Sequence, residues 1–266
     1  MRRNRLGRVS DNSRSFPNLF FFYFCIFAFF ALLVFCGCGL DTYYVLDQAP
    51  RVGRIVNYNE VDPAVRYFEF YAAPNSNAGN SEFGFLGTFV YYKIYSNPST
   101  MTSNHNSIEA VNNSSNYSAA AERMIGLGYK ELYTSNGSRS PLVSESVGTA
   151  YVRIRLTNND ENGHGDIGHA AQIEIGGVNV GIPRRSRGQS YSFDFGRNGK
   201  AEYSGRGINY DLPISDEDFY GGSPSDGKYY VDMYAVAAGR DTTFARYYSN
   251  VTYLGSITIN ANEENN

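Results

Sequence analysis

Ala150-Tyr151-Val152-Arg153-Ile154-Arg155-Leu156-Thr157 is a stretch in which apolar and polar side chains alternate without a break. Side chains of an extended strand point alternately to its two faces, so this stretch has one apolar face and one polar face. Such a strand is typical of an antiparallel sheet that rests on a core with one face and meets water with the other.

The same period of two returns in several other segments of the chain. They are 65–72, 84–96, 172–175, 178–182, 191–195, 229–237 and 250–259. Clusters of Gly, Asn, Ser and Pro separate them, and Gly176-Gly177 between two of them predicts a two-residue hairpin turn. About eight or nine short strands of this kind predict an all-β fold, an antiparallel β-sandwich.

The strand at 84–96 carries tyrosines that we expect to face solvent. Tyr92 and Ile94 share the predicted core face, which leaves Tyr91 and Tyr95 on the other. Tyr combines apolar contact area with a hydroxyl and is common in recognition surfaces, although it also suits any half-exposed strand. Tyr91 and Tyr95 are therefore the predicted binding residues.

Residues 98–140 interrupt the strand pattern. The segment is rich in Ser and Asn, but Ala119–Ile125 consists of helix formers. Ser118 is placed as an N-cap, and Gly126 or Gly128 as a stop. We expect a flexible insertion that carries one short helix and serves either as a binding loop or as a tolerated surface loop.

Two parts of the chain resemble strands of immunoglobulin and fibronectin-III domains. Gly87–Tyr95 is similar to their third strand, and Tyr230–Ala238 with Ser249–Val251 is similar to their closing hairpin. The resemblance implies an immunoglobulin- or fibronectin-III-like sandwich over 62–266, with 38–61 as a tether or first edge strand. Because one such domain has roughly 100 residues, one elaborated sandwich, two small ones and another type of sandwich remain alternatives.

The first 37 residues have the pattern of an export signal. Arginines precede Leu19–Phe35, a run of seventeen residues without a charged side chain. A basic start, an apolar core and small residues after it are typical of a secretory signal peptide, whose basic end stays in the cytoplasm. The alternative is an uncleaved signal-anchor helix. In both cases the remainder of the chain is expected to be exported.

The end of the apolar run, Phe35-Cys36-Gly37-Cys38-Gly39, resembles the signal of bacterial lipoproteins. In that family a small residue precedes a Cys that is joined to diacylglycerol and becomes the new N-terminus. Gly37 and Cys38 match these positions, whereas Phe35 stands where Leu is usual, as in the looser signals of spirochaetes. Gly39–Leu46 is similar to the mature start of uncharacterised spirochaete lipoproteins. The resemblance implies a signal peptide at 1–37, lipid on Cys38, and attachment to an envelope membrane, facing the periplasm or the cell surface.

Charge and cysteine content argue against several classes of protein. Without residues 1–37 the chain holds 18 basic and 25 acidic side chains, a net charge of about −7. A nucleic-acid partner is not expected, because binding one needs a basic face. No Cys follows Cys38, so neither a disulfide nor a thiolate metal site is expected in the exported part.

One loop and one acidic stretch supply the remaining candidate sites. The candidate metal ligands of the loop 158–169 are Asp160, His164, Asp166 and His169. The loop partly matches a calcium loop but lacks carboxylates at the first and last ligand positions, and a polar hairpin loop is the alternative. The acidic stretch 211–226 and the basic group 184–187 are expected to be solvated or to pair with each other.

No catalytic or phosphate-binding motif accompanies these residues, so neither enzyme activity nor a cofactor is expected. The sequence therefore favours a lipid-anchored binding module for a protein or glycan partner. The alternatives are a structural envelope protein without a soluble ligand, and a hydrolase that uses His164 and Asp166 or the acidic stretch.

Overall fold

The computed structural model describes residues 22–24, 26–27, 44–113, 115–136, 141–156, 170–187, 191–193, 218–222 and 228–260. By its internal contacts the chain divides into Met1–Tyr43 and Tyr44–Asn266. The few described residues of the first unit are helical and exposed. No helix among the described residues is long and apolar enough to cross a membrane. Cys38 lies outside the described residues.

The smaller of the two main sheets has four antiparallel strands. They are β1 (Phe68–Tyr71), β6 (Tyr151–Arg155), β7 (Gln172–Ile175) and β8 (Val178–Gly181), in the order β1-β6-β7-β8. The predicted hairpin turn is confirmed, because Gly176 and Gly177 join β7 to β8 with φ of 60° and 80°. Positive φ at both positions is what a two-residue hairpin turn of type I′ requires.

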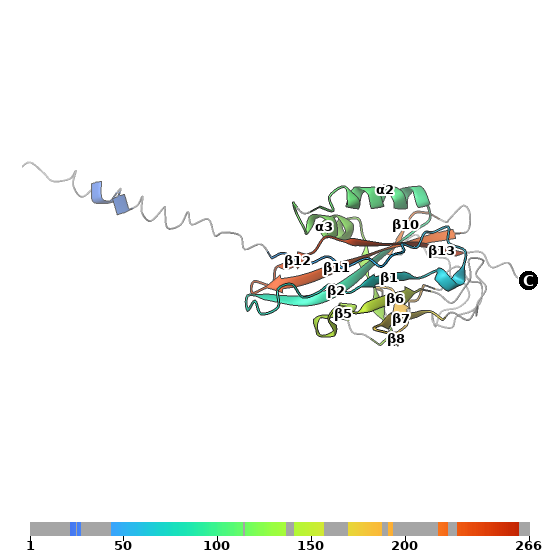
Figure 1. Cartoon of the computed structure of the whole chain (residues 1–266). Helices are drawn as coiled ribbons and strands as arrows, with labels where there is room; N and C mark the ends of the chain where they lie inside the picture. Colours follow the sequence, from blue (N-terminus) through green and yellow to red (C-terminus); the bar gives the residue numbers. More distant parts are fainter. Residues whose placement is uncertain are drawn as a thin grey trace, which may run out of the picture. The chain divides into compact units, whose positions relative to one another are not determined.

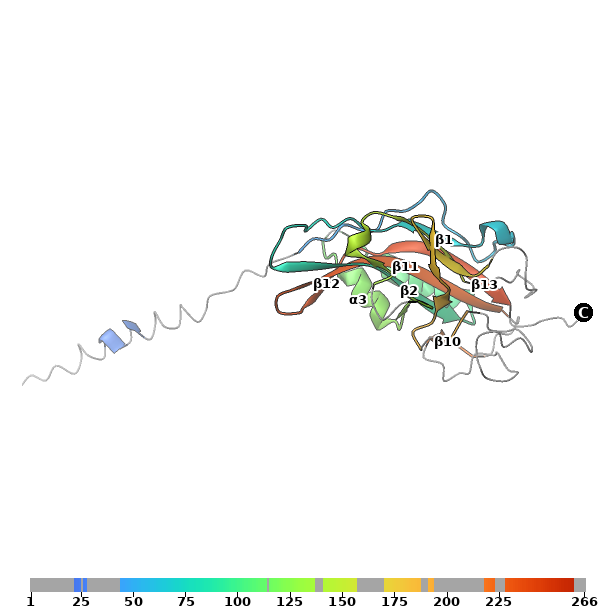
Figure 2. The same ribbon diagram turned by 90° about the horizontal axis from the view of Figure 1, so that it is seen from below.

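The larger sheet is built on two long antiparallel strands, β2 (Phe83–Tyr95) and β11 (Lys228–Asp241). Figure 2 shows them side by side. Shorter strands flank them: β3 (Lys130–Glu131), β5 (Val143–Ser144) and β10 (Phe219–Tyr220) on β2, and β12 (Arg246–Tyr248) and β13 (Thr252–Asn260) on β11. A separate pair joins β4 (Tyr133–Thr134) to β9 (Pro183–Arg184). The fold is thus mostly β with antiparallel sheets, as the alternation predicted. The strand predicted at 191–195 is absent from its described part, 191–193.

Both faces of the larger sheet are buried. On one face, Tyr92, Ile94 and Met233 form an apolar cluster with side chains of the smaller sheet, including Phe68 and Ile154. On the other face lies a second cluster, which joins the sheet to two helices. Its members include Tyr91, Tyr95, Tyr234, Met101, Ile108 and Met124. Figure 1 shows the helices on one side of β2 and β11 and the smaller sheet on the other.

The prediction that Tyr91 and Tyr95 face solvent is therefore wrong. Only 3% of Tyr91 and 0% of Tyr95 is exposed. The alternation along β2 was assigned correctly, since Tyr92 and Ile94 do face the smaller sheet. The prediction failed for the other face of β2, because the helices of the insertion 98–140 cover it.

The insertion holds two helices rather than the single one predicted. α3 (Ala119–Gly126) is the predicted helix, and Gly128, with φ of 88°, follows its end. Ser118 does not cap it with its side chain; its hydroxyl instead accepts a hydrogen bond from the Tyr248 N–H at 3.2 Å.

The second helix, α2 (Pro98–Glu109), was missed because its Ser, Asn and Thr residues have weak helix propensity. Its start is well defined: the Asn97 side chain accepts from the Ser99 N–H at 2.8 Å, and Pro98 occupies the first turn. Met101 and Ile108 lie two turns apart and are buried against the larger sheet. Packing therefore stabilises a helix that propensity alone does not favour.

The segment before the first strand contains no regular strand in its described part, 44–61. It makes isolated bridges from Arg51 to Phe70 and from Val56 to Gly255. Leu46, Ala49 and Val56 are buried in the cluster between the two sheets. Two short 3-10 helices complete the described elements: η1 (Pro63–Val65) and η2 (Glu145–Val147).

We expect Gly255→Ala to destabilise the protein strongly. Gly255 has φ of 113°, and a Cβ there would lie 2.1 Å from the Val56 carbonyl oxygen. Gly177→Ala is the matched control, because Gly177 also has positive φ but no heavy atom within 4 Å of such a Cβ. Denaturant unfolding should show a loss of about 1 kcal/mol for the control and about 3 kcal/mol for Gly255→Ala. Equal losses would mean that segment 44–61 moves aside without cost.

Candidate functional site

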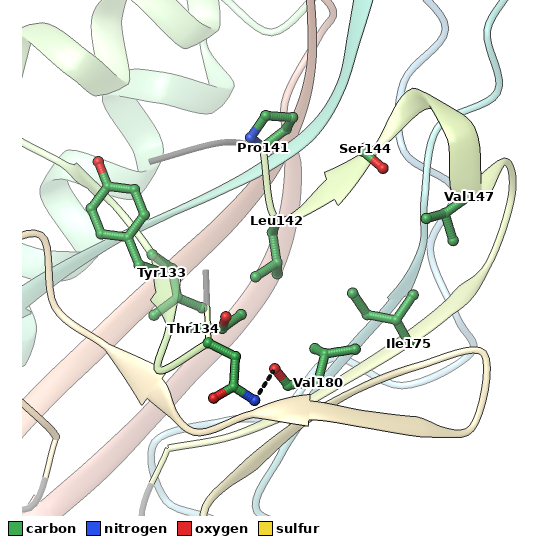
Figure 3. Close-up of a pocket in the computed structure, with 10 residues that line it drawn as sticks. Tyr133, Thr134, Pro141, Leu142, Ser144, Val147, Ile175 and Val180 are labelled. Atoms are coloured by element: carbon green, nitrogen blue, oxygen red, sulfur yellow. Dashed lines mark hydrogen bonds between the residues drawn. The ribbon is translucent and has the colours of Figure 1, made fainter. Parts of the chain in front are cut away.

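An apolar pocket lies between the hairpin of β7 and β8 and the chain segments 132–136 and 141–147. It has a volume of about 310 Å³, and its lining is Leu132, Tyr133, Thr134, Asn136, Pro141, Leu142, Ser144, Val147, Ile175 and Val180. Figure 3 shows Leu142, Ile175 and Val180 pointing toward one another, whereas the ring of Tyr133 points away from them. The Asn136 amide donates to the Val180 carbonyl at 3.3 Å. Six of the ten lining side chains are aliphatic, so the pocket suits an apolar group.

A second pocket, here called the tyrosine pocket, lies where α3 ends over the larger sheet. It has a volume of about 430 Å³, and its lining is Tyr91, Ile125, Tyr129, Lys130, Glu131, Tyr133, Ser186, Arg246 and Tyr248. Tyr91 comes from β2, Ile125 from α3, and Arg246 and Tyr248 from β12. Tyr133 lines both pockets, which are therefore neighbours.

Glu131 organises the tyrosine pocket. Its Oε1 accepts from the Tyr91 hydroxyl at 3.1 Å, and its Oε2 accepts from the Tyr133 hydroxyl at 3.2 Å. Arg246 Nη1 lies 3.5 Å from Oε1 in a partly exposed ion pair. Burial, and then the charge of Glu131, raise the pKa of Tyr91 above its usual value. The pocket therefore presents a neutral phenol, a carboxylate and a guanidinium in fixed positions.

A buried polar network stands behind the pocket, between the larger sheet and the helices. The Tyr129 hydroxyl donates to Asp232 Oδ2 at 2.6 Å and lies 3.1 Å from the Tyr95 hydroxyl, which also accepts from Asn104 at 3.0 Å. Asp232 is fully buried, and burial raises its pKa to about 7, while hydrogen bonds from Tyr129 and Tyr253 oppose that rise. This carboxyl is therefore partly protonated near neutral pH.

Lys93 is the other buried charge on this face. It is the cross-strand partner of Asp232 in the sheet, yet its ammonium group donates to the Leu127 carbonyl and lies 4.6 Å from the centre of the Tyr220 ring. Burial, and then the charge of Lys130, lower the pKa of Lys93 to about 8. Lys93 thus holds the end of α3 to the sheet.

The structure brings only some of the predicted site residues together. Tyr91 lines the tyrosine pocket, and Tyr95 lies in the buried network. The loop residues Asp160, His164, Asp166 and His169 lie outside the described residues. Within the part of the chain that the structure describes, no three His, Cys, Asp or Glu side chains are grouped as a metal site would need.

Pairing between the acidic stretch and the basic group is confirmed for its described part. Asp218 Oδ2 lies 3.9 Å from Arg185 Nε, and both side chains are almost fully buried. Asp218 also accepts from the Tyr92 hydroxyl at 2.6 Å and the Ser186 hydroxyl at 3.1 Å. This pair therefore ties two distant chain segments together beside the core.

Sequence reasoning missed Glu131, Arg246 and Asp232. A signal for Asp232 was present, because it is the only charged residue of 229–239, an otherwise apolar part of β11. A charge in such a strand is rarely buried without partners. No comparable signal marks Glu131 and Arg246, which meet only through the fold.

Comparisons of the chain with protein-family models, curated proteins and solved structures give no match.

Proposed function

We propose that this chain is a lipid-anchored, exported protein of a bacterial cell envelope, and that its β-rich part is a non-enzymatic binding module for a protein partner. The apolar pocket is the observation that supports binding, and the sequence pattern of residues 1–38 supports the lipid anchor. Residues 1–38 resemble the signal of spirochaete-type lipoproteins.

An immunoglobulin- or fibronectin-III-like sandwich belongs to the same proposal. The shared cluster of Phe68, Ile154 and Tyr92 between the two sheets supports a sandwich. The order β2-β11-β13 supports the immunoglobulin-like layout. In such domains the third strand also pairs with the penultimate one, which pairs with the last.

The anchor rests on the arginines before Leu19–Phe35 and on Gly37-Cys38, which follows that run after one residue, Cys36. Cells grown with a clickable palmitate should label the wild-type chain and not Cys38→Ser. Cys36→Ser is the matched control and should label normally. Label that persists in Cys38→Ser would place the anchor elsewhere.

A protein partner suits the apolar pocket for two reasons. Its volume is at the lower end of the roughly 300–1,000 Å³ typical of ligand pockets, which matches one or two apolar side chains. It also adjoins β8, the last strand of the smaller sheet, where Val178 is 64% exposed. An extended segment of a partner can lie along such a strand and place alternate side chains in a pocket.

Site-directed photo-crosslinking on intact cells tests this binding mode. A benzoylphenylalanine at Val147, which lines the pocket and is 48% exposed, should cross-link to one discrete protein. The same probe at Val61, which is 61% exposed and lies neither in the pocket lining nor on β8, is the matched control and should cross-link weakly. Val180→Gln should reduce the Val147 product at least about tenfold, because it places an amide in an apolar site. Equal products from both probes, or a product insensitive to Val180→Gln, would contradict the proposal.

A further inference from the structure

We propose that the tyrosine pocket is a second binding site and that its ligand is a neutral sugar ring. This site is separate from the apolar pocket and from the protein partner proposed for it. The inference rests on the charge balance of its lining, on its aromatic rings and on the rigidity of its walls.

The pocket lining holds charges of both signs, one carboxylate and two cations, so a charged ligand of either sign meets a like charge there. An anion would approach the carboxylate of Glu131, and a cation would approach Arg246 and Lys130, all of which line the same space. A neutral ligand avoids both repulsions. Such a ligand must still donate hydrogen bonds to Glu131 and accept them from Arg246 and Lys130. Covering a polar group without giving it a hydrogen-bond partner costs free energy. Hydroxyl groups do both, and a sugar carries several of them.

Arg246 is placed to recognise adjacent hydroxyls. Its Nη1 faces Glu131, and a guanidinium carries five N–H donors in a planar array. The guanidinium carbon lies 5.0 Å from the centre of the Phe89 ring and 6.0 Å from that of Tyr248. Cation–π contacts with these rings, together with the ion pair to Glu131, restrict the position of the guanidinium.

Aromatic rings supply the apolar part of the site. Tyr133 and Tyr248 line the pocket and are both partly exposed, whereas Tyr91 is buried beneath it. Ring faces carry partial negative charge and attract the positively polarised C–H groups of a ligand. A sugar ring presents such C–H groups on its faces and hydroxyls on its rim. Its faces can therefore pack on the tyrosine rings while its hydroxyls bind Glu131 and Arg246.

The walls are held in place before any ligand arrives. Tyr91 is fixed by Glu131, and Tyr129 is fixed by Asp232 and Tyr95 through the buried network. Little side-chain ordering is then left for the binding step, which favours affinity. The volume of about 430 Å³ lies within the range of small-molecule sites and suits one or two sugar rings.

Saturation-transfer NMR with the full-length chain in detergent tests the inference. The probes are glucose, galactose, mannose and N-acetylglucosamine at millimolar concentration, with inorganic phosphate and free arginine as charged comparators. We expect at least one sugar to bind, and neither comparator to displace it. Arg246→Gln should weaken this binding about tenfold, and Tyr133→Phe should weaken it less, because it removes one hydroxyl and keeps the ring.

Arg240→Gln is the matched control. Arg240 lies directly opposite Arg246 in the β11–β12 pair but does not line the pocket, so its loss should leave sugar binding unchanged. Val180→Gln should also leave it unchanged, which separates this site from the protein-binding pocket. The inference is overturned if none of the four sugars binds in an Arg246-dependent way, or if phosphate or arginine binds there as tightly as the best sugar.

Discussion

Replacing Asp232 by Asn is expected to stabilise the protein, and to do so increasingly as the pH rises. The folded pKa of Asp232, about 7, lies above the unfolded value of about 3.9. The folded state therefore binds more protons, and stability is lost as the pH rises from about 4 through 7. Asn resembles the neutral carboxyl and does not titrate. Between pH 5 and pH 8 its advantage over the wild type should grow by about 3 kcal/mol, to about 4 kcal/mol.

Urea unfolding of both proteins at several pH values measures this difference. His105, which lies 2.7 Å from the Tyr234 hydroxyl, has a pKa lowered by burial. It causes a loss of stability as the pH falls below about 6.5. That contribution is present in both proteins, so their difference isolates Asp232. A difference that stays constant between pH 5 and pH 8 would show that Asp232 is ionised throughout and that the helices do not seal it from water.

Tyr95→Ala is expected to cost about 4 kcal/mol of unfolding free energy. Truncating a fully buried aromatic ring removes its transfer free energy and leaves a cavity. The change also removes the hydroxyl that accepts from Asn104 and meets Tyr129, and so breaks the link between α2 and the buried network. Chemical denaturation should therefore show a much lower midpoint for this variant.

Two further variants separate the ring from its hydroxyl and from its neighbours. Tyr95→Phe keeps the ring and should cost only about 1–2 kcal/mol. Tyr220→Ala removes a ring that is 54% exposed and lies 6.3 Å from that of Tyr95, and it should cost less than about 1 kcal/mol. If Tyr95→Ala unfolds at the wild-type midpoint, the helices do not cover this face and Tyr95 meets solvent after all.

Local patterns in the sequence were enough to predict most strands. The alternation along 84–96 and 229–237 places Tyr92, Ile94 and Met233 on the correct face, because a period of two is a property of the extended backbone itself. Gly176-Gly177 marked its turn, and the helix formers of Ala119–Ile125 marked α3. Each of these signals involves residues close together in the chain.

The candidate site could not be predicted in the same way. Glu131 lies on β3 and Arg246 on β12, and these strands flank opposite sides of the β2–β11 pair. Glu131 and Arg246 come close only because both side chains reach across the same face of the sheet. The apolar pocket likewise combines β7 and β8 with the segments 132–136 and 141–147, and no local pattern in the sequence connects these parts.

By itself, then, the sequence determined the mostly β fold class and the assignment of side chains to one face or the other of each long strand. Only the tertiary structure decided that the second face of β2 is buried. Tyr91 and Tyr95 suit a solvent-facing surface and an internal one equally well, since a tyrosine has an apolar ring and a polar hydroxyl. What buries them is the pair of helices α2 and α3. Of the two, α2 has weak propensity and is stable because Met101 and Ile108 pack on the same tyrosine-rich face.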